Sequence, residues 1–248
     1  MASGTDSGRQ PGGGLPLTER VALVTGGSLG IGRAIALRLA GMGVSVAICG
    51  KDESALASTL RELQSHGGHS YAHRADVTRT KEVADLVSAT ESSLGLVSVL
   101  VNNAGIGIFG PVQERTEEEW DAVLSTNLKS VFLVSCAVIP GMIRRGGGDI
   151  VNISSLAGRN TFAGGAIYCA SKWGLQGLTA CMAEDLRQFN VRVSSVLPGS
   201  VATDFGRRDK DAAKALAPED VAHAVAMLLT QRAQSFISEV QLRPLHKS

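Results

Sequence analysis

A short stretch near the N-terminus decides the fold: Val21-Ala22-Leu23-Val24-Thr25-Gly26-Gly27-Ser28-Leu29-Gly30-Ile31-Gly32. Its apolar beginning is too short for a helix and predicts a buried strand, and the helical spacing of Arg33–Ala40 predicts a helix after the glycines. A strand, a glycine turn and a helix N-terminus in this order form a cradle for phosphate, because free N–H groups and the helix dipole favour an anion there. A plain tight turn is the alternative, since the spacing is not G-x-G-x-x-G and no Gly-Lys-Ser/Thr of a Walker loop follows.

Strand-like runs alternate with helix-like segments along the rest of the chain. The runs are Val21–Val24, Val44–Cys49, Ser70–Arg74, Val97–Val101, Ile150–Ile153, Val191–Leu197 and Phe236–Leu242. The segments are Leu29–Ala40, Ser54–Ser65, Thr80–Ser93, Glu117–Arg144, Tyr168–Asn190 and Pro218–Gln231. This alternation predicts a single-domain α/β fold: a doubly wound sheet of about seven mainly parallel strands with helices on both faces. Thr116 and Glu119 form a capping box that predicts where the longest segment starts, and that segment is compatible with two helices.

Composition and charge limit the possible domain organisation, partners and location of the protein. Residues 1–17 predict a disordered tail without the apolar region of a signal peptide, and residues 18–248 predict one dinucleotide-binding domain with a mobile, charged lid at about 200–217. A formal net charge of +1 and the lack of a basic stretch give no support for a nucleic-acid partner. No uninterrupted apolar run predicts a membrane span. Four cysteines without a C-x-x-C pattern favour a cytoplasmic protein with reduced thiols.

Three histidines, His66, His69 and His73, have spacings that can align metal ligands on a helix. Two glycines separate the first pair, and a strand is expected from His69 onward. No H-E-x-x-H motif is present. We therefore interpret them as surface or loop residues and predict no metal site.

Tyr168 and Lys172 carry the main chemical signal. On a helix the two side chains lie on one face about one turn apart. A nearby ammonium favours the phenolate and is expected to lower the pKa of the phenol, which makes Tyr168 a candidate general acid or base. The alternative is an aromatic ring with a lysine stem packed over it.

Six motifs in order now define a resemblance over about residues 18 to 235. They are Thr25-Gly26-x-x-x-Gly30-Ile31-Gly32, Asp76-Val77, Asn102-Asn103-Ala104-Gly105, the set Asn127, Ser155, Tyr168 and Lys172, Pro198-Gly199, and Thr203. In these motifs the chain resembles the short-chain dehydrogenase/reductase family. The resemblance implies a Rossmann-type fold and an oxidoreductase that interconverts a carbonyl and a secondary alcohol with NAD(P)(H).

The resemblance also implies the catalytic roles. Tyr168 is the general acid or base, Ser155 holds the substrate oxygen, Lys172 supports Tyr168 and binds the nicotinamide ribose, and Asn127 holds a water next to Lys172. Ser155 as a simple strand-end hydroxyl and Asn127 as a helix-interior amide bonded to backbone are the alternatives.

The cofactor residues follow from the same motifs. They are Gly26, Ser28, Leu29, Gly30, Ile31, Gly32, Lys51, Asp76, Val77, Asn103, Ala104, Gly105, Tyr168, Lys172, Pro198, Gly199, Val201 and Thr203. Asp76 has a turn or cap as its alternative role, and Thr203 a helix N-cap. Gly50 and Lys51 stand where an NAD enzyme places an acidic side chain, which favours NADP(H) over NAD(H). Asp52 is expected to cap the next helix, while Leu29 stands where many NADP-dependent members carry a basic residue.

The sequence is compatible with two hypotheses for the substrate. A small-molecule carbonyl or alcohol is the main one, and a 3-oxoacyl-carrier-protein reductase is the alternative. A cofactor-binding sensor without turnover is the third hypothesis, against which the intact Ser155, Tyr168 and Lys172 argue. A homodimer or homotetramer is expected, with the choice left open by a C-terminus that lacks the family's usual glycine-containing ending.

Overall fold

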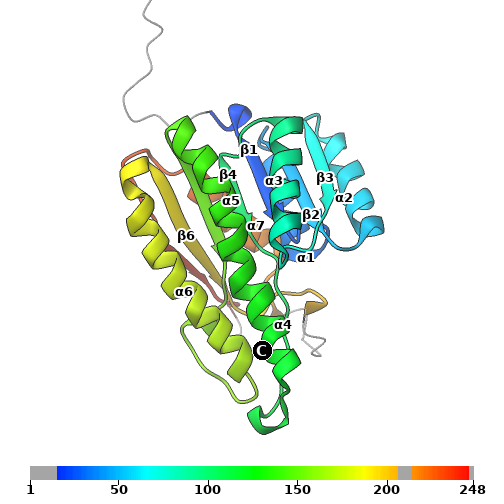
Figure 1. Cartoon of the computed structure of the whole chain (residues 1–248), viewed down its shortest axis with the longest axis vertical. Helices are drawn as coiled ribbons and strands as arrows, with labels where there is room; N and C mark the ends of the chain where they lie inside the picture. Colours follow the sequence, from blue (N-terminus) through cyan, green and yellow to red (C-terminus); the bar gives the residue numbers. More distant parts are fainter. Residues whose placement is uncertain (1–15, 206–213, 246–248) are drawn as a thin grey trace, which may run out of the picture.

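The computed structural model describes residues 16–205 and 214–245. Residues 1–15 of the predicted tail and residues 206–213 of the predicted lid therefore lie outside the described residues, whereas Leu17 at the end of the predicted tail begins a 3-10 turn, Leu17–Glu19. Within them, seven strands form one sheet of parallel neighbours in the order β3-β2-β1-β4-β5-β6-β7 (Figure 1). The strands are β1 (Val21–Thr25), β2 (Ser45–Gly50), β3 (Ser70–Arg74), β4 (Val99–Asn102), β5 (Gly148–Ile153), β6 (Val191–Pro198) and β7 (Glu239–Leu242).

Helices cover both faces of this sheet. They are α1 (Gly30–Ala40), α2 (Glu53–Ser65), α3 (Thr80–Leu94), α4 (Glu117–Leu124), α5 (Ser130–Arg145), α6 (Ala166–Leu186) and α7 (Pro218–Leu229). Helices α1, α2 and α7 pack on one face, while α3, α5 and α6 pack on the other, which faces the viewer in Figure 1. The fold is the predicted doubly wound, Rossmann-type α/β domain.

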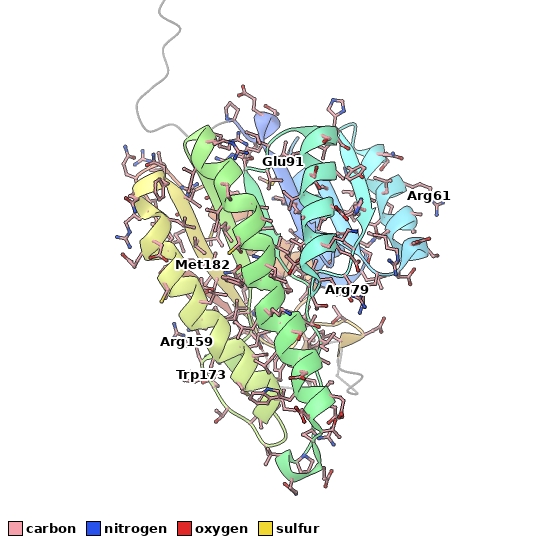
Figure 2. The ribbon with its side chains drawn as sticks, viewed as in Figure 1. Arg61, Arg79, Glu91, Arg159, Trp173 and Met182 are labelled. Carbon is pink, nitrogen blue, oxygen red and sulfur yellow. The ribbon has the colours of Figure 1, made fainter. Side chains whose placement is uncertain are left out.

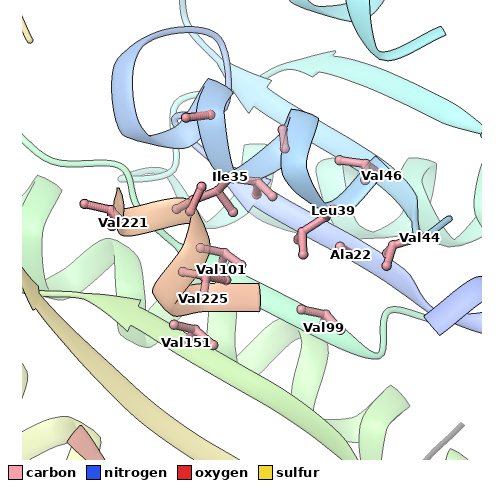
Figure 3. Close-up of a cluster of buried hydrophobic side chains, with 14 of the residues drawn as sticks. Ala22, Ile35, Leu39, Val44, Val46, Val99, Val101, Val151, Val221 and Val225 are labelled. Carbon is pink, nitrogen blue, oxygen red and sulfur yellow. The ribbon is translucent and has the colours of Figure 1, made fainter. Parts of the chain in front are cut away.

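Strand alternation explains why the sheet is buried on both faces. In β1, Ala22 and Val24 face the α1–α7 side while Leu23 faces the α3–α5 side. Figure 3 shows the first of these cores, where Ile35 and Leu39 of α1 and Val225 of α7 lie over the central strands. Apolar residues in consecutive strand positions are what a sheet covered on both faces requires.

Two elements differ from the sequence predictions by more than two residues at one end. The last strand begins at Glu239 and not at Phe236. The helix expected from Tyr168 begins at Ala166 and ends at Leu186, followed by a 3-10 turn over Arg187–Phe189. The capping box at Thr116 is confirmed, with Glu119 N–H donating to the Thr116 hydroxyl and Thr116 N–H donating to the Glu119 carboxylate.

The segment from Glu117 to Arg145 is one continuous helical rod and not two separate helices. A π-helical turn, Ser125–Lys129, joins α4 to α5. By length and composition alone this rod could cross a membrane. In the fold, Val134, Val138 and Met142 of α5 instead pack into the core beside the sheet, as in a core helix of a folded domain.

The sheet order places the expected functional residues at one edge. The chain proceeds from β1 outward to β2 and β3, then crosses to β4 beside β1, so the order reverses between β1 and β4. Ligands of doubly wound sheets bind beyond the carboxyl ends of the strands at such a switch point. Gly26 follows β1, Asn103 follows β4 and Ser155 follows β5 at this edge.

Candidate functional site

The turn between β1 and α1 is built for an anion. Gly26 and Gly30 have φ of +61° and +52°, a region that side chains with a Cβ rarely adopt. A Cβ on Gly32 would lie 2.1 Å from the Gly26 carbonyl oxygen, so only glycine fits there. No side chain caps the N-terminus of α1 at Leu29, and its first N–H groups remain for a ligand. A cofactor pyrophosphate fits this cradle.

Asn103 ties the loop after β4 to this turn. Its side-chain amide donates to the carbonyl oxygens of Thr25 at 3.0 Å and Gly26 at 3.1 Å. The backbone N–H groups of Asn103 and Ala104 both donate to the Thr25 hydroxyl. The Asn103-Ala104-Gly105 motif thus holds the two strand ends at the switch point together.

Lys51 and Asp76 lie beside one another past the ends of β2 and β3. The Lys51 Nζ is 4.0 Å from Asp76 Oδ2, and the lysine side chain is 73% exposed. Burial acts to raise the pKa of Asp76, but hydrogen bonds from Thr78 and the charges of Lys51 and Arg79 together hold it below its ordinary value. Asp76 also forms the turn expected as its alternative role, because its Oδ1 accepts from the Thr78 N–H and hydroxyl. Asp52 caps α2 as expected, accepting from the Ala55 N–H at 3.0 Å.

Several of the expected cofactor residues contribute through backbone or packing. The Val77 and Val201 side chains are buried in the core, and Ile31 packs against it. The Leu29 side chain is exposed. Ser28 is buried, and its carbonyl oxygen accepts from Thr59 of α2. The buried side chains of Val77 and Val201 therefore serve the core, and at these two positions the backbone is the part left to contact a cofactor.

The segment after β6 reaches back over the glycine turn. The Gly199 N–H donates to the carbonyl oxygen of Leu242 in β7 at 2.8 Å, which fixes the turn after Pro198. A Cβ on Gly30 would lie 3.3 Å from Thr203 Cγ2, so Thr203 stands directly above the cradle. The Thr203 hydroxyl accepts from the Phe205 N–H at 3.4 Å, and a lid helix that Thr203 would cap, its alternative role, falls outside the described residues.

Tyr168, Ser155 and Lys172 converge at the end of β5. Tyr168 and Lys172 lie one turn apart on α6 and are buried, with 8% and 5% of their surfaces exposed. The Ser155 hydroxyl is a hydrogen-bond partner of the Tyr168 phenol. The Lys172 Nζ lies 5.9 Å from the centre of the Tyr168 ring and donates to the Ile153 carbonyl oxygen at 2.9 Å. A buried lysine is costly, and burial of this kind is common where the group has a chemical role.

The expected lowering of the Tyr168 pKa by Lys172 is wrong for the protein without cofactor. Burial raises the pKa of Tyr168 to about 12, and the hydrogen bond with Ser155 opposes this only in part. Burial likewise lowers the pKa of Lys172 to about 8. Desolvation is the largest cause of both shifts because both side chains lie in the protein interior. Tyr168 therefore holds its proton at neutral pH.

Asn127 lies in the π-helical turn, where such turns often mark functional sites. Its side-chain oxygen accepts from the Ile106 N–H at 2.8 Å, and its amide donates to the Ile106 carbonyl oxygen and to the Ser171 hydroxyl. This is the backbone-bonded amide expected as its alternative role. Asn127 thus joins the loop after β4 to α6 beside Lys172.

Sequence reasoning missed two further groups around α6. One is the network in which Glu239 of β7 accepts from Arg159 at 2.8 Å and from Gln176 of α6 at 2.7 Å; Figure 2 labels Arg159 beside α6. The other is a row of phenylalanine rings around Tyr168. Neither has a short motif, because their members come from segments far apart in the chain. Among the described residues, no group of three His, Cys, Asp or Glu side chains could hold a metal ion.

The depressed pKa of Lys172 predicts a measurable pH dependence of stability. Between pH 8 and 10.5 the unfolded chain binds a proton at Lys172 that the folded protein does not, so this residue makes unfolding less favourable as the pH rises. Between pH 7.5 and 10.5, this effect is expected to add on the order of 1–3 kcal/mol to the free energy of unfolding of wild type. Lys172→Met lacks this gain, so the difference in stability between the two proteins should grow by that amount. Urea unfolding across this range measures the difference, with Lys81→Met at an exposed position of α3 as control. Parallel curves for wild type and Lys172→Met would contradict the assignment.

The comparisons with known proteins give the family. The family model of the short chain dehydrogenases matches residues 20–234. The chain belongs to the short-chain dehydrogenase/reductase family, as its motifs indicated, and is an oxidoreductase of that family.

Three relatives show how far the likeness extends. A metagenomic short-chain oxidoreductase, solved in complex with NADP, is 44% identical with a TM-score of 0.84 and covers 94% of this chain and 100% of its own. The alcohol dehydrogenase of the archaeon Thermococcus sibiricus, complexed with 5-hydroxy-NADP, is 30% identical with a TM-score of 0.87, over 92% and 98% of the two chains. A 3-oxoacyl-[acyl-carrier-protein] reductase of Staphylococcus epidermidis is 38% identical over 87% of this chain and 93% of its own.

Proposed function

We propose that this protein uses NADP(H) in preference to NAD(H) to interconvert a carbonyl and a secondary alcohol, with Tyr168 as the general acid and base. The observation that carries the proposal is the convergence of Tyr168, Ser155 and the buried Lys172 at the strand edge that also holds the glycine cradle. Two of the related structures are complexes with NADP or a derivative of it, which supports the cofactor.

Each of these residues has a distinct role in the proposed carbonyl reduction. The nicotinamide supplies the hydride, and the protein supplies orientation and a proton. Negative charge grows on the carbonyl oxygen, where the Ser155 hydroxyl donates a hydrogen bond and Tyr168 donates its proton. Lys172 beneath the ring supplies positive charge that stabilises the phenolate left behind and, as the family resemblance implies, binds the nicotinamide ribose. Asn127 positions α6 through Ser171.

A turnover panel tests the proposal directly. Ketones, aldehydes, acetoacetyl thioesters and secondary alcohols are each assayed with NADPH or NADH, or with the oxidised cofactors, by absorbance of the reduced nicotinamide. Carbonyl reduction dependent on NADPH supports the proposed function. Tight cofactor binding without turnover of any compound would overturn it in favour of a cofactor-binding sensor.

Lys51 is expected to carry the cofactor preference. Its ammonium is exposed beyond the end of β2, where a charge-assisted hydrogen bond to a 2′-phosphate contributes about 1.5–3 kcal/mol, roughly tenfold or more in affinity. Lys51→Ala should therefore lower the ratio of kcat/KM for NADPH over NADH by about tenfold, while Lys51→Arg retains most of it. A wild-type preference for NADH, or an unchanged ratio of kcat/KM in Lys51→Ala, would show that Lys51 does not bind the 2′-phosphate of the cofactor.

The carrier-protein reductase is the second candidate function. Relatives with that name include the 38% identical protein of Staphylococcus epidermidis and one of Synechocystis at 36% identity. The panel separates the two candidates, because a carrier-dependent enzyme reduces acetoacetyl thioesters far better than simple ketones.

We also propose a homo-oligomer, a dimer or a tetramer, since members of this family are typically oligomeric. A second copy of this chain fits an apolar groove of about 500 Å³ between the helical rod and α6, whose apolar lining includes Leu128, Phe132 and Leu178. Phe132 is 51% exposed there. A charge buried in an interface without a partner costs several kcal/mol, so Phe132→Glu is expected to shift the mass measured by light scattering toward the monomer. An unchanged mass would place the interface elsewhere.

A cytoplasmic location is our final proposal. All four cysteines are free thiols, and Cys136 and Cys181 are exposed. Unpaired exposed thiols are what a reducing compartment allows. Fractionation of cells that express the protein tests the location, and recovery in a membrane or secreted fraction would contradict it.

A further inference from the structure

Four aromatic rings form a row, and one of them is the proposed catalytic Tyr168. Phe162 and Phe109 have ring centres 5.9 Å apart, Phe109 and Tyr168 5.3 Å, and Tyr168 and Phe205 5.9 Å. The interplanar angles of 46°, 62° and 59° are those of tilted and edge-to-face pairs, which aromatic rings favour. Phe109 follows β4, Phe162 precedes α6 and Phe205 follows β6, so three loops at the carboxyl edge contribute one ring each.

The rings meet close to the reacting phenol. A Cβ on Gly107 would lie 2.7 Å from Phe109 Cε2 and 2.8 Å from Phe205 Cε1, so these two rings converge over a residue without a side chain. Phe109 and Phe205 pack against a small cluster formed by Ala157, Tyr168 and Cys169. Phe162 at the outer end of the row is 40% exposed. The row therefore extends from the surface to Tyr168.

Two cations on the neighbouring loops are engaged by carboxylates. Arg115, which lies against Gly110, pairs with Glu119 at 3.1 Å and with Glu114 at 3.8 Å. Arg159, in the loop after Ser155, pairs with Glu239 at 2.8 Å. Within the described residues these two arginines are held by carboxylates and Lys172 donates to the Ile153 carbonyl oxygen, so the surroundings of the Tyr168 ring offer a substrate mainly aromatic surface.

We propose that Phe109, Phe205 and Phe162 select uncharged carbonyl compounds that carry an aromatic ring on the carbonyl carbon. A carbonyl oxygen held at Ser155 and Tyr168 puts its larger substituent beside Phe109 and Phe205. An aryl group there gains edge-to-face contacts and buries apolar area, whereas a carboxylate loses hydration without a partner. The proposal rests on the proposed function, since it assigns the substrate class of the same site.

The test compares substrates that differ in one feature. Acetophenone and 2-butanone are both methyl ketones, with and without a ring. Benzoylformate replaces the methyl group of acetophenone with a carboxylate. S-acetoacetyl-N-acetylcysteamine represents the carrier-bound substrate. We expect kcat/KM with NADPH to be at least about tenfold higher for acetophenone than for any of the others, since each aromatic contact is worth up to about tenfold.

Phe109→Leu and Phe205→Leu keep an apolar side chain but remove the ring. Each is expected to lower the ratio of acetophenone to 2-butanone severalfold, chiefly by slowing acetophenone. Because the readout is a ratio within one protein sample, partial unfolding does not mimic the effect. Phe189→Leu, in the 3-10 turn after α6 and away from the rings, is the matched control and should leave the ratio unchanged.

The possible outcomes distinguish a failure of the aromatic selection from a failure of the proposed function. Turnover of the ketones without an aryl preference, a preference for benzoylformate or the thioester, or an aryl preference that survives both substitutions would overturn the aromatic selection alone. Turnover of no carbonyl compound would overturn the proposed function, and the aromatic selection with it.

Discussion

Tyr168→Phe is expected to lower kcat by about 10²–10⁴ while cofactor affinity stays within about twofold of wild type. The substitution keeps the ring, and with it the contacts to Phe109 and Phe205. It removes only the hydroxyl that hydrogen-bonds with Ser155 and is the proposed proton donor. Because the raised pKa of about 12 keeps this phenol protonated at neutral pH, its loss removes the proton donor for carbonyl reduction.

The chain offers a matched control for this experiment. Tyr71, the other tyrosine, lies in β3 with its hydroxyl 3.2 Å from His73 Nδ1, away from the site. Tyr71→Phe also removes one hydroxyl and should leave kcat unchanged. Steady-state kinetics with the best carbonyl substrate and a fluorescence titration of NADPH measure both quantities. A Tyr168→Phe variant with nearly wild-type kcat would remove Tyr168 from the mechanism.

Asp149→Ala is expected to destabilise the fold by about 3–5 kcal/mol. Asp149 lies in β5 at the end of the sheet opposite the site and is buried, with Oδ2 2.9 Å from Arg20 and Oδ1 2.7 Å from Arg192. It joins the chain before β1 to the start of β6. In Asp149→Ala, the largely buried guanidinium groups of Arg20 and Arg192 lose the negative charge that both of them contact. Removing one partner of a buried ion pair costs several kcal/mol.

Urea unfolding at a fixed protein concentration measures this loss, since stability of an oligomer depends on concentration. Asp85→Ala, which removes an exposed carboxylate from α3, serves as control and should change stability by less than about 0.5 kcal/mol. A loss below about 1 kcal/mol in Asp149→Ala would mean that this ion-paired cluster contributes little to the fold.

The elements near the site were predictable because local rules and the global fold agree there. The glycines of the first turn are required by backbone geometry: Gly26 and Gly30 have positive φ, and Gly32 has no room for a Cβ. Alternating strand and helix patterns predicted the parallel sheet, whose order then placed Asn103, Ser155 and Tyr168 at one edge. The cap of α2 at Asp52 was predictable for the same reason, because a cap depends on neighbours in sequence.

The sign of the Tyr168 pKa shift was not predictable from spacing. Two groups four residues apart on a helix suggest an electrostatic pair, but the balance depends on how much water surrounds them. Burial of both groups decides it, with Phe109 and Phe205 packed against the cluster that contains Tyr168. Lys172 also donates to the Ile153 carbonyl oxygen, a partner that no sequence pattern indicates.

By itself the sequence determined the doubly wound sheet and the glycine turn and indicated Ser155, Tyr168 and Lys172 as candidate catalytic residues, because each of these is marked by residues close together in the chain. The tertiary structure alone decided the protonation of Tyr168 and Lys172, the aromatic row of Phe162, Phe109 and Phe205, and the pairing of Asp149 with two arginines. These features depend on desolvation and on contacts between segments far apart in sequence. Such contacts are set by how the layers pack, and no local pattern encodes them.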